Sequence, residues 1–460
     1  MPKKKTALTI EERLQQALVP AEEQPYEVPE NWVWVRLGSL LKEIKNGTTI
    51  KQDKSGNGFS VTRIESLQNQ TIDLMRVGTI LETEKIKETD WYKSGDITLS
   101  HINSIEHVGK TALITDAMLP LVHGMNLLRL RFFEIYTPDL FQLYSQTYQY
   151  KNEIRSRINM AVNQVSINQK QLSSLEIPLP PLSEQQRIVE RIEELFAKLD
   201  EAKERLQEAA ESFAVRKAAI LHKAFTGELT KQWRRENGVR DESWEEKTIS
   251  EICSSLKYGT SKKSSDDGEV VVLRMGNLQN GEIDWSNLSY TSDEEDIKKY
   301  LLKSGDVLFN RTNSPELVGK TSIYRGEMPA IYAGYLIKLD YEKNIVVGDY
   351  LNYYLNSSKA KEYYMQVKTD GVSQSNINAK KIGEFEIPLP TLSEQHEIVR
   401  LINDLLARER SAQQAAEQAL ASIDLIKKSI LARAFRGELG TNKASEASAL
   451  ELLRQVLAEN

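Results

Sequence analysis

Two long segments of the chain carry apolar residues at alternating steps of four and three. Nine of ten positions are apolar in the first series: Ile188, Ile192, Leu195, Leu199, Ala202, Leu206, Ala209, Phe213, Arg216 and Ile220. Nine of ten are apolar in the second: Ile398, Ile402, Leu405, Glu409, Ala412, Ala416, Ala419, Ile423, Ile426 and Ile430. This heptad spacing predicts two long helices that pair as an antiparallel coiled coil. The alternative is that each helix lies separately on its own globule.

Before each long helix lies a segment of about 150 residues with shorter apolar runs. Val270 to Met275 and Asp306 to Phe309 are examples, and Gly, Asn and Asp separate such runs, which is typical of strands and turns. Prolines end both segments, namely Pro178, Pro180, Pro181, Pro388 and Pro390. Each half of the chain is therefore predicted to be a mixed α/β (α+β) globule followed by one long helix.

Capping signals mark three helix starts. Ser183 with Gln186 predicts a capping box that opens the first long helix. Thr9-x-x-Glu12 predicts a short helix through Leu18, and Ser448-x-x-Glu451 predicts another through Leu457. These two terminal helices are candidate docking elements for a partner, with ordinary packing as the alternative.

The two halves align with each other at an offset that drifts only from 212 to 210 residues. The matched landmarks are Trp32 with Trp244, Gly47-Thr48 with Gly259-Thr260, Lys93-Ser-Gly-Asp96 with Lys303-Ser-Gly-Asp306, Val108-Gly-Lys-Thr111 with Val318-Gly-Lys-Thr321, Ile177-Pro-Leu-Pro180 with Ile387-Pro-Leu-Pro390, Leu182-Ser-Glu-Gln185 with Leu392-Ser-Glu-Gln395, and Gly227-Glu-Leu229 with Gly437-Glu-Leu439. One register through so many landmarks indicates a duplication.

The repeat divides the chain into seven predicted parts. They are an N-terminal docking segment (1–30), a first globule (31–182), a central helix (183–230), a linker (231–242), a second globule (243–392), a C-terminal long helix (393–440) and a C-terminal docking helix (441–460).

Composition adds limits to this plan. The net charge is −6, with 17 Lys and Arg against 15 Asp and Glu (net +2) in 31–182, and 18 against 22 (net −4) in 243–392. Any positive face for nucleic acid must therefore be assembled by folding or supplied by partners. The single cysteine, Cys253, excludes an internal disulfide and a cysteine-based zinc site. Without a signal-peptide core or a membrane-length apolar run, we expect a cytoplasmic protein with no membrane contact.

Motifs for catalysis are not found in the sequence. Gly109 to Thr111 and Gly319 to Thr321 resemble the end of a Walker A loop, but the earlier glycine that the loop requires is replaced by Ser104 and Ser314. No Gly-x-Gly-x-x-Gly motif and no Asn-Pro-Pro-Tyr-like run occurs. The five histidines have no metal-ligand spacing: His101, His107, His123, His222 and His396.

The repeated motifs resemble those of one protein family. Ile-Pro-Leu-Pro-x-Leu-Ser-Glu-Gln at the helix start, Ala-Phe-x-Gly-Glu-Leu at its end, and Lys-Ser-Gly-Asp before Val-Gly-Lys-Thr resemble the specificity subunit of type I restriction-modification enzymes. The resemblance implies two target-recognition domains, each reading half of a bipartite site in double-stranded DNA, and paired helices that act as a ruler.

The resemblance also implies partners and cofactors. Two modification subunits would supply S-adenosylmethionine and adenine methylation, and motor-nuclease restriction subunits would join for DNA cleavage and phage defence. S-adenosylmethionine, ATP and Mg²⁺ are expected on those subunits, and no cofactor or catalytic site is expected on this chain.

Candidate DNA-binding residues lie in polar loops after the aligned strand. They are Ser100, His101, Asn103 and Lys110 in the first half, and Asn310, Arg311, Asn313 and Lys320 in the second. Arg and Asn can make bidentate contacts with guanine and adenine, although any one of these residues could be an ordinary exposed turn residue.

Two further loops, Asn163–Asn168 and Val372–Asn378, offer Gln164 and Gln374 for phosphate or base contact. Asn168 and Asn378 are predicted instead to cap short helices. Arg63 and Arg274 occur in both halves, which favours phosphate contact or a fold role over base choice.

Two other functions remain open at this stage. A DNA methyltransferase active by itself would need a cofactor pocket, and labelled S-adenosylmethionine binding would detect one. A purely structural coiled-coil adaptor would leave both globules without a role.

Overall fold

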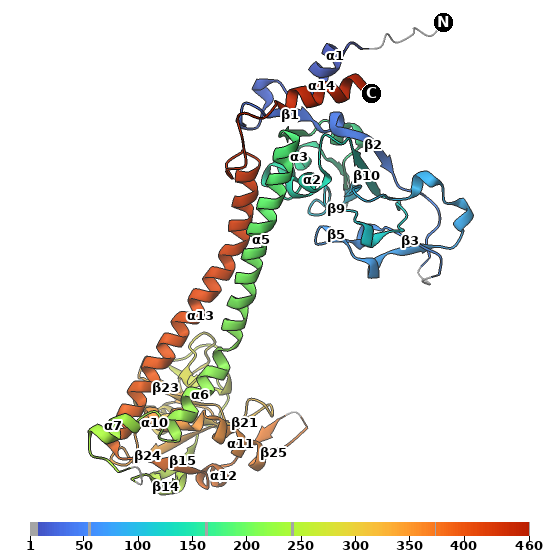
Figure 1. Cartoon of the computed structure of the whole chain (residues 1–460). Helices are drawn as coiled ribbons and strands as arrows, with labels where there is room; N and C mark the ends of the chain where they lie inside the picture. Colours follow the sequence, from blue (N-terminus) through green and yellow to red (C-terminus); the bar gives the residue numbers. More distant parts are fainter. Residues whose placement is uncertain (1–7, 54–56, 162–163, 241–242, 373, 460) are drawn as a thin grey trace. The chain divides into compact units, whose positions relative to one another are not determined.

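The computed structural model describes residues 8–53, 57–161, 164–240, 243–372 and 374–459 (Figure 1). The α-helices are α1 Ile10–Ala17, α2 Pro138–Tyr144, α3 Tyr148–Arg157, α4 Gln169–Ser173, α5 Leu182–Glu211, α6 Phe213–Phe225, α7 Lys231–Glu236, α8 Ile249–Ile252, α9 Glu294–Tyr300, α10 Gly348–Leu355, α11 Ser358–Val367, α12 Ala379–Gly383, α13 Leu392–Ala434 and α14 Ala449–Glu459.

The strands fall into two sets. The first set is β1 Val33–Arg36, β2 Leu41–Asn46, β3 Phe59–Val61, β4 Leu67–Gln68, β5 Thr71–Ile72, β6 Gly78–Ile80, β7 Ile97–Ser100, β8 Ile102–Asn103, β9 Thr111–Leu113, β10 Leu127–Phe132, β11 Asn159–Ala161, β12 Gln164–Ser166 and β13 Glu176–Leu179. The second is β14 Glu245–Thr248, β15 Cys253–Tyr258, β16 Val270–Leu273, β17 Leu278–Gln279, β18 Glu282–Ile283, β19 Tyr290–Thr291, β20 Val307–Asn310, β21 Thr312–Asn313, β22 Thr321–Ile323, β23 Ala330–Tyr332, β24 Leu336–Tyr341, β25 Thr369–Asp370, β26 Ser375–Asn376 and β27 Glu386–Leu389.

The chain forms two compact units that do not follow the linear order of the predicted parts. Unit 1 contains Met1–Arg205 and Ala419–Asn460, and unit 2 contains Leu206–Gln418. Unit 1 therefore combines the first globule with the start of α5 and the end of α13. Unit 2 combines the second globule with α6 and the start of α13.

The same sheet forms the centre of each globule. Its strand order is β2-β10-β7-β9 in unit 1 and β15-β24-β20-β22 in unit 2, with antiparallel pairing throughout. A second ladder closes each globule, where β1 pairs with β13 and β14 pairs with β27. The predicted mixed α/β plan and its duplication are confirmed, because equivalent strands occupy equivalent places in both sheets.

The predicted helix boundaries need three corrections. Ser183 is not a cap, because Pro181 already accepts backbone bonds from Glu184 and Gln185 at 2.9 and 3.1 Å, so α5 starts at Leu182. The central helix is interrupted at Ser212, whose Oγ donates to the Ala209 carbonyl at 2.9 Å. A serine hydroxyl that bonds to a carbonyl of the preceding turn distorts a helix.

The third correction concerns the predicted linker 231–242, which contains helix α7, Lys231–Glu236. Its Arg234 is buried and bonds to Glu394, so tertiary contacts hold this segment in place. Residues 241–242 of the predicted linker lie outside the described residues.

Segments of the two long helices pack together within each unit. In unit 1, Lys427 of α13 pairs with Asp200 of α5 at 2.6 Å, and Ile192 shares a core with Leu431. In unit 2, Leu221 of α6 shares a core with Ile402 of α13. The predicted stripes are only partly right, since Ile426 is exposed.

The two polar residues of the apolar series meet each other in unit 2. Arg216 of α6 donates from Nε to an oxygen of the Glu409 carboxylate on α13 at 2.6 Å. Each is the single polar residue in its heptad series, and the sequence of one series does not show that its polar residue pairs with that of the other. A polar pair in an otherwise apolar seam favours one register of the two helices.

The repeated Ser-Glu-Gln motif fastens each globule to its helix through a buried glutamate. In unit 1, Glu184 accepts bonds from Trp32 at 2.7 Å, Thr441 at 3.1 Å and Asn442 at 2.8 Å. Thr441 and Asn442 follow the Gly-Glu-Leu motif of the other half. The end of the second repeat thus binds the helix start of the first.

Unit 2 repeats this arrangement with a cation added. Glu394 accepts bonds from Thr230 and Arg234 at 2.7 Å and from Trp244 at 3.1 Å. Thr230 follows the first Gly-Glu-Leu motif, so the end of the first repeat binds the helix start of the second. The motif glutamine next to Glu394, Gln395, donates to the carbonyls of Ile345 and Pro390.

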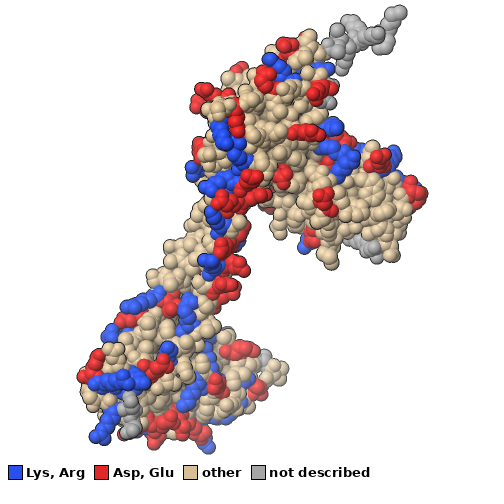
Figure 2. Space-filling view, in the orientation of Figure 1, with Lys and Arg blue, Asp and Glu red and all other residues tan. Residues whose placement is uncertain are grey.

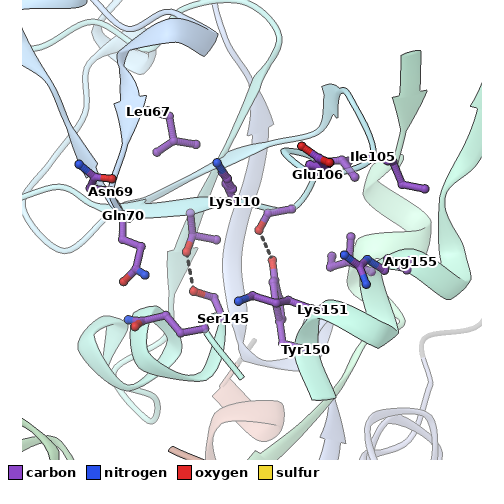
Figure 3. Close-up of a pocket in the computed structure, with 15 residues that line it drawn as sticks. Leu67, Asn69, Gln70, Ile105, Glu106, Lys110, Ser145, Tyr150, Lys151 and Arg155 are labelled. Atoms are coloured by element: carbon purple, nitrogen blue, oxygen red, sulfur yellow. Dashed lines mark hydrogen bonds between the residues drawn. The ribbon is translucent and has the colours of Figure 1, made fainter. Parts of the chain in front are cut away.

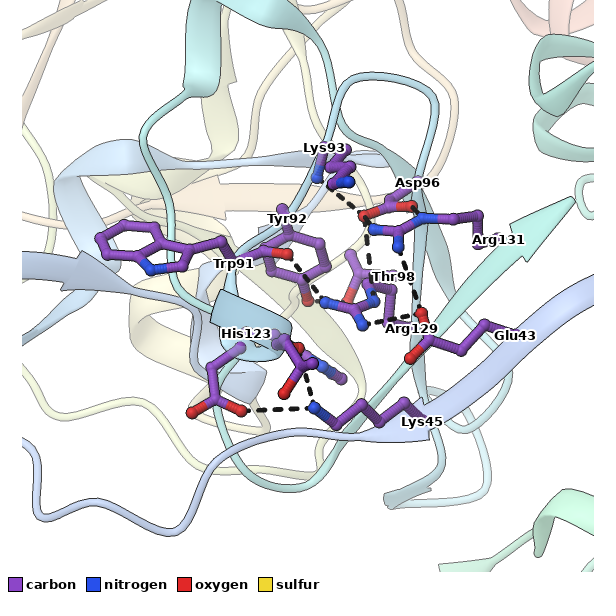
Figure 4. A network of polar contacts seen from close by, with 12 residues as sticks. Glu43, Lys45, Trp91, Tyr92, Lys93, Asp96, Thr98, His123, Arg129 and Arg131 are labelled. Atoms are coloured by element: carbon purple, nitrogen blue, oxygen red, sulfur yellow. Dashed lines mark hydrogen bonds and ion pairs between the residues drawn. The ribbon is translucent and has the colours of Figure 1, made fainter. Parts of the chain in front are cut away.

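A polar network fastens the segment before β7 to the sheet of unit 1 (Figure 4). Buried Arg129 donates to the Trp91 carbonyl at 2.8 Å and to Glu43 at 2.9 Å. Arg131 makes two 2.7 Å bonds to Asp96, the aspartate of the first Lys-Ser-Gly-Asp motif. Asp96 also accepts a bond from the Lys93 backbone at 2.8 Å, so this motif is a structural turn.

The termini of the described chain pack together in unit 1. The predicted capping box of Thr9 and Glu12 is confirmed, and α1 contacts α14. Leu14 of α1 and Leu453 of α14 are buried in the same core, and Arg13 donates to the Leu457 carbonyl at 3.1 Å. Among the described residues, no helix has the length and apolar character needed to cross a bilayer.

Candidate nucleic-acid interface

The predicted polar loops are brought together by a small three-stranded sheet in each unit. In unit 1, β8 pairs with β12, so Asn103 lies opposite Val165 and beside Gln164. In unit 2, β21 pairs with β26, so Asn313 lies opposite Ser375, next to Gln374. The structure therefore joins loops that are about 60 residues apart in the sequence.

Two candidates are too buried to contact DNA. Ser100 retains 1% of its surface and Asn310 retains none, because both end a central strand of the sheet. Ser100 Oγ accepts a bond from Asn103 at 3.1 Å, and Asn310 Oδ1 accepts one from the Thr312 backbone at 3.3 Å. We withdraw both from the candidate contacts, since almost none of either side chain is accessible.

The next matched position is His101 in unit 1 and Arg311 in unit 2. Burial lowers the pKa of His101, so its imidazole is neutral near pH 7. Arg311 lies 4.8 Å from the ring centre of Tyr258 and donates to Asn376 at 3.3 Å. The two halves therefore place different chemistry at one site, which is expected of readers with different targets.

Sequence reasoning missed two aromatic residues beside Arg311. Tyr258 ends β15 and is 41% exposed, and Tyr335 precedes β24 and is 50% exposed. The Tyr335 carbonyl accepts a bond from the Arg311 backbone at 3.0 Å, which places all three residues at one edge of the sheet. Exposure of an aromatic side chain would have marked these two tyrosines as candidates, but the sequence does not reveal which tyrosines are exposed.

The Gly-Lys-Thr turns have a packing role. Gly109 has φ +79°, and a Cβ there would lie 2.8 Å from the Ile154 side chain of α3. Gly319 has φ +93°, and its Cβ would lie 2.3 Å from the Tyr364 ring of α11. Only glycine combines a left-handed backbone with so close an approach, so these turns hold the loop against the helix.

The two shared arginines and the two predicted cap residues have local partners. Arg63 pairs with Glu65 at 3.0 Å, and Arg274 donates to Asn287 at 3.2 Å, which supports a fold role for both arginines. The predicted caps are confirmed: Asn168 accepts from the Gln171 backbone and Asn378 from the Lys381 backbone. Asn163 and Ser373, in the two candidate loops, lie outside the described residues.

A cavity of about 370 Å³ lies beside the first Gly-Lys-Thr turn (Figure 3). Its wall includes the predicted candidate Lys110 from the turn, together with Lys151 and Arg155 from α3, which sequence reasoning missed. The Tyr150 hydroxyl donates to the Gly109 carbonyl at 2.9 Å and fixes the turn to the helix. Lys110 thus gains cationic neighbours that only the fold supplies.

Charge is mixed over the visible surface of both units. Figure 2 shows Lys and Arg interspersed with Asp and Glu on this face. This agrees with the nearly balanced composition of each globule. Positive potential for a nucleic acid must therefore come from local clusters such as the one at Lys110 and Lys151.

Known proteins share this duplicated organisation. The Type I restriction modification DNA specificity domain matches the chain twice, at residues 29–211 and 241–418. A putative type I restriction enzyme MjaX specificity subunit from Methanocaldococcus jannaschii is 34% identical over 418 residues, which cover 85% of this chain and 92% of that protein. The EcoKI specificity subunit of Escherichia coli is 26% identical over 94% of this chain and 96% of its own.

Solved structures agree in fold. The HsdS subunit from Thermoanaerobacter tengcongensis superposes with a TM-score of 0.64 at 19% identity, covering 91% of this chain and all of that one. A chain from a study of complex assembly and conformational transition of the type I R-M system gives 0.62 at 19% identity, over 90% of this chain. The tandem mixed globules are therefore a fold that solved proteins share.

Proposed function

Because the chain belongs to the type I restriction modification DNA specificity family, we propose that it selects the DNA target of a type I restriction-modification complex. Each globule reads one half of a bipartite duplex site. The supporting observation is that equivalent sheets present different side chains at matched positions, with His101 in unit 1 and Arg311 beside Tyr258 in unit 2. Two sheets of the same fold that carry different side chains at their edges can recognise two different DNA sequences.

The long helices have a separate role in this proposal. They form an antiparallel coiled coil that sets the spacing of the two half-sites and binds two modification subunits. The ion pair of Arg216 with Glu409 and that of Lys427 with Asp200 support this pairing, because both join a helix of the first repeat to α13. Restriction subunits join the same complex for cleavage.

The chemistry belongs to the partner subunits. S-adenosylmethionine for adenine methylation, and ATP with Mg²⁺ for translocation and cleavage, bind there rather than on this chain. The Gly-Lys-Thr turns, which resemble the end of a Walker A loop, support the assignment of ATP to partner subunits, since Gly109 and Gly319 pack against helices.

Co-expression tests the proposed function. The purified chain alone should transfer no methyl group from labelled S-adenosylmethionine to DNA. Addition of its modification subunit should produce adenine methylation at one bipartite motif, read by methylome sequencing. The same modification subunit without this chain is the control. Methyl transfer by the chain alone, or an unchanged methylome when the chain is absent, would refute the proposal.

The ruler role predicts a change in spacer length. Seven residues inserted into each long helix, near Leu206 and Ala416, add about 10 Å at 1.5 Å per residue and keep the heptad phase. DNA rises about 3.4 Å per base pair, so the preferred spacer should lengthen by about three base pairs. Selection from a library of spacer lengths measures this shift. An unchanged spacer, or new bases at the half-sites, would contradict the ruler role.

A further inference from the structure

The same basic cavity occurs at equivalent places in the two units. In unit 1 it is lined by Lys110, Lys151 and Arg155, together with amides of Asn69 and Gln146. In unit 2 a cavity of about 450 Å³ is lined by Lys217, Lys320 and Lys361, together with Asn280 and Asn356. We call these two cavities the lysine pockets.

Three members of the pockets occupy matched positions in the repeat. Lys110 matches Lys320 in the Gly-Lys-Thr turns, and Lys151 matches Lys361 at the same offset of 210 residues. Asn69 matches Asn280 in the β4–β5 and β17–β18 hairpins. Both pockets have the same residue type at each of these positions. The neighbouring sheet edge, in contrast, has His101 in unit 1 and Arg311 in unit 2.

Among the described residues, the salt bridges that the structure contains do not include these pocket cations. Among the described residues, no carboxylate oxygen lies within 4.0 Å of the charged nitrogens of Lys110, Lys151, Arg155, Lys217 or Lys361. Burial lowers the pKa of Lys151, and nearby Lys428, Arg155 and Lys110 lower it further. Burial likewise lowers the pKa of Lys217, with Lys361 and Arg410 adding to the effect. Each wall also contains one glutamate, Glu106 in unit 1 and Glu316 in unit 2. Three cations against one carboxylate leave an excess of positive charge in each hollow, which favours an anion.

We propose that each lysine pocket binds a phosphate group of the DNA backbone, with its paired lysines neutralising the charge and its amides donating hydrogen bonds. This inference rests on the proposed function. A phosphate is the same at every base pair, so two readers of different sequences can use one conserved contact for it. The pockets therefore add affinity and fix orientation, while the edge at His101 and Arg311 selects bases.

The two lysine pockets lie near residues of the long helices. Phe213 and Lys217 of α6 form part of the wall of the unit 2 pocket. In unit 1, Lys428 of α13 is close enough to Lys151 to lower its pKa. The unit 2 pocket thus lies where the globule meets its long-helix segment, and the unit 1 pocket has a cation of α13 near one of its lysines.

The test removes one matched lysine from each pocket in the full chain, assembled with its modification subunit. The variant Lys151→Ala with Lys361→Ala is titrated with a duplex carrying the methylome-defined target and with a random duplex of equal length, over 0.05 to 0.2 M salt. Each lost phosphate contact should lower the slope of log K against log salt by about 0.9, and weaken binding about tenfold at 0.1 M salt. Both duplexes should lose affinity equally.

Lys93→Ala with Lys303→Ala is the matched control. These exposed lysines are also repeated, carry the same charge and line neither pocket. They should leave the slope nearly unchanged. Thermal unfolding should show no loss of stability in the pocket variant, because removing like charges relieves repulsion.

The outcomes distinguish a failure of the proposed function from a failure of the phosphate contact. If the unaltered complex binds both duplexes equally, the proposed function fails. If it prefers its target but the pocket variant keeps the salt slope, the phosphate contact is wrong. Weaker binding of the modification subunit with unchanged DNA affinity would show that the pockets hold an acidic protein segment instead, which also overturns the inference.

Discussion

Glu394→Ala is expected to lower the free energy of unfolding by about 3–5 kcal/mol. Glu394 is fully buried, and its carboxylate lies 2.7 Å from the guanidinium of Arg234, which is itself buried. Removal of the glutamate would take a 2.7 Å carboxylate contact away from the buried Arg234 guanidinium, and would also remove the acceptor of the Thr230 hydroxyl and the Trp244 indole. Urea denaturation followed by tryptophan fluorescence and circular dichroism measures the loss.

Two further variants make this prediction specific. Glu397→Ala, one turn along α13, removes a partly exposed pair with Arg400 and should cost about 0.5 kcal/mol or less. Adding Arg234→Ala to Glu394→Ala should recover part of the lost stability, because the buried guanidinium that Glu394 contacts is then absent as well. Additive losses in that double variant would show that the ion pair does not hold α7 to α13.

Exchange of a single globule is expected to replace one half of the DNA target and leave the other half intact. The structure suggests boundaries inside the closing ladder, at residues 41–172, so that the β1–β13 pairing and the bond from Trp32 to Glu184 stay native. Affinity for the old site should fall by about 10³ or more, toward that for random DNA. Methylome sequencing of cells that carry the chimaera with its modification subunit reads the new target.

The matching exchange in the second globule, at residues 253–382, is the control and should alter the opposite half-site. Both chimaeras should keep the spacer length, because the long helices are unchanged. A chimaera that is folded and active but has changed both half-sites would show that the globules do not read independently.

The sequence alone determined the organisation of this protein, because its strongest signals are local or repetitive. Heptad spacing required only side-chain order, and it predicted helices where α5, α6 and α13 lie. The caps at Thr9, Asn168 and Asn378 were also predictable, since a cap bonds to a backbone amide within three residues. The duplication followed from motif register, and it predicted two globules of the same mixed α/β plan.

Tertiary structure decided which polar residues of the candidate interface are accessible. Ser100 and His101 are neighbours in one polar loop, yet Ser100 ends a central strand and is buried. Accessibility there depends on β12 and β10, which come from later parts of the chain. No local pattern contains that information, so the loop was predictable and its exposed members were not.

The same reason applies to the contacts that join the repeats. The sequence showed Arg216 and Glu409 as isolated exceptions in two apolar series, and only the packing of α6 against α13 made them a pair. Likewise, Lys110 and Lys151 became one pocket because α3 packs on the Gly-Lys-Thr turn. Pairing between distant segments is fixed by how their surfaces fit together, which only the folded chain determines.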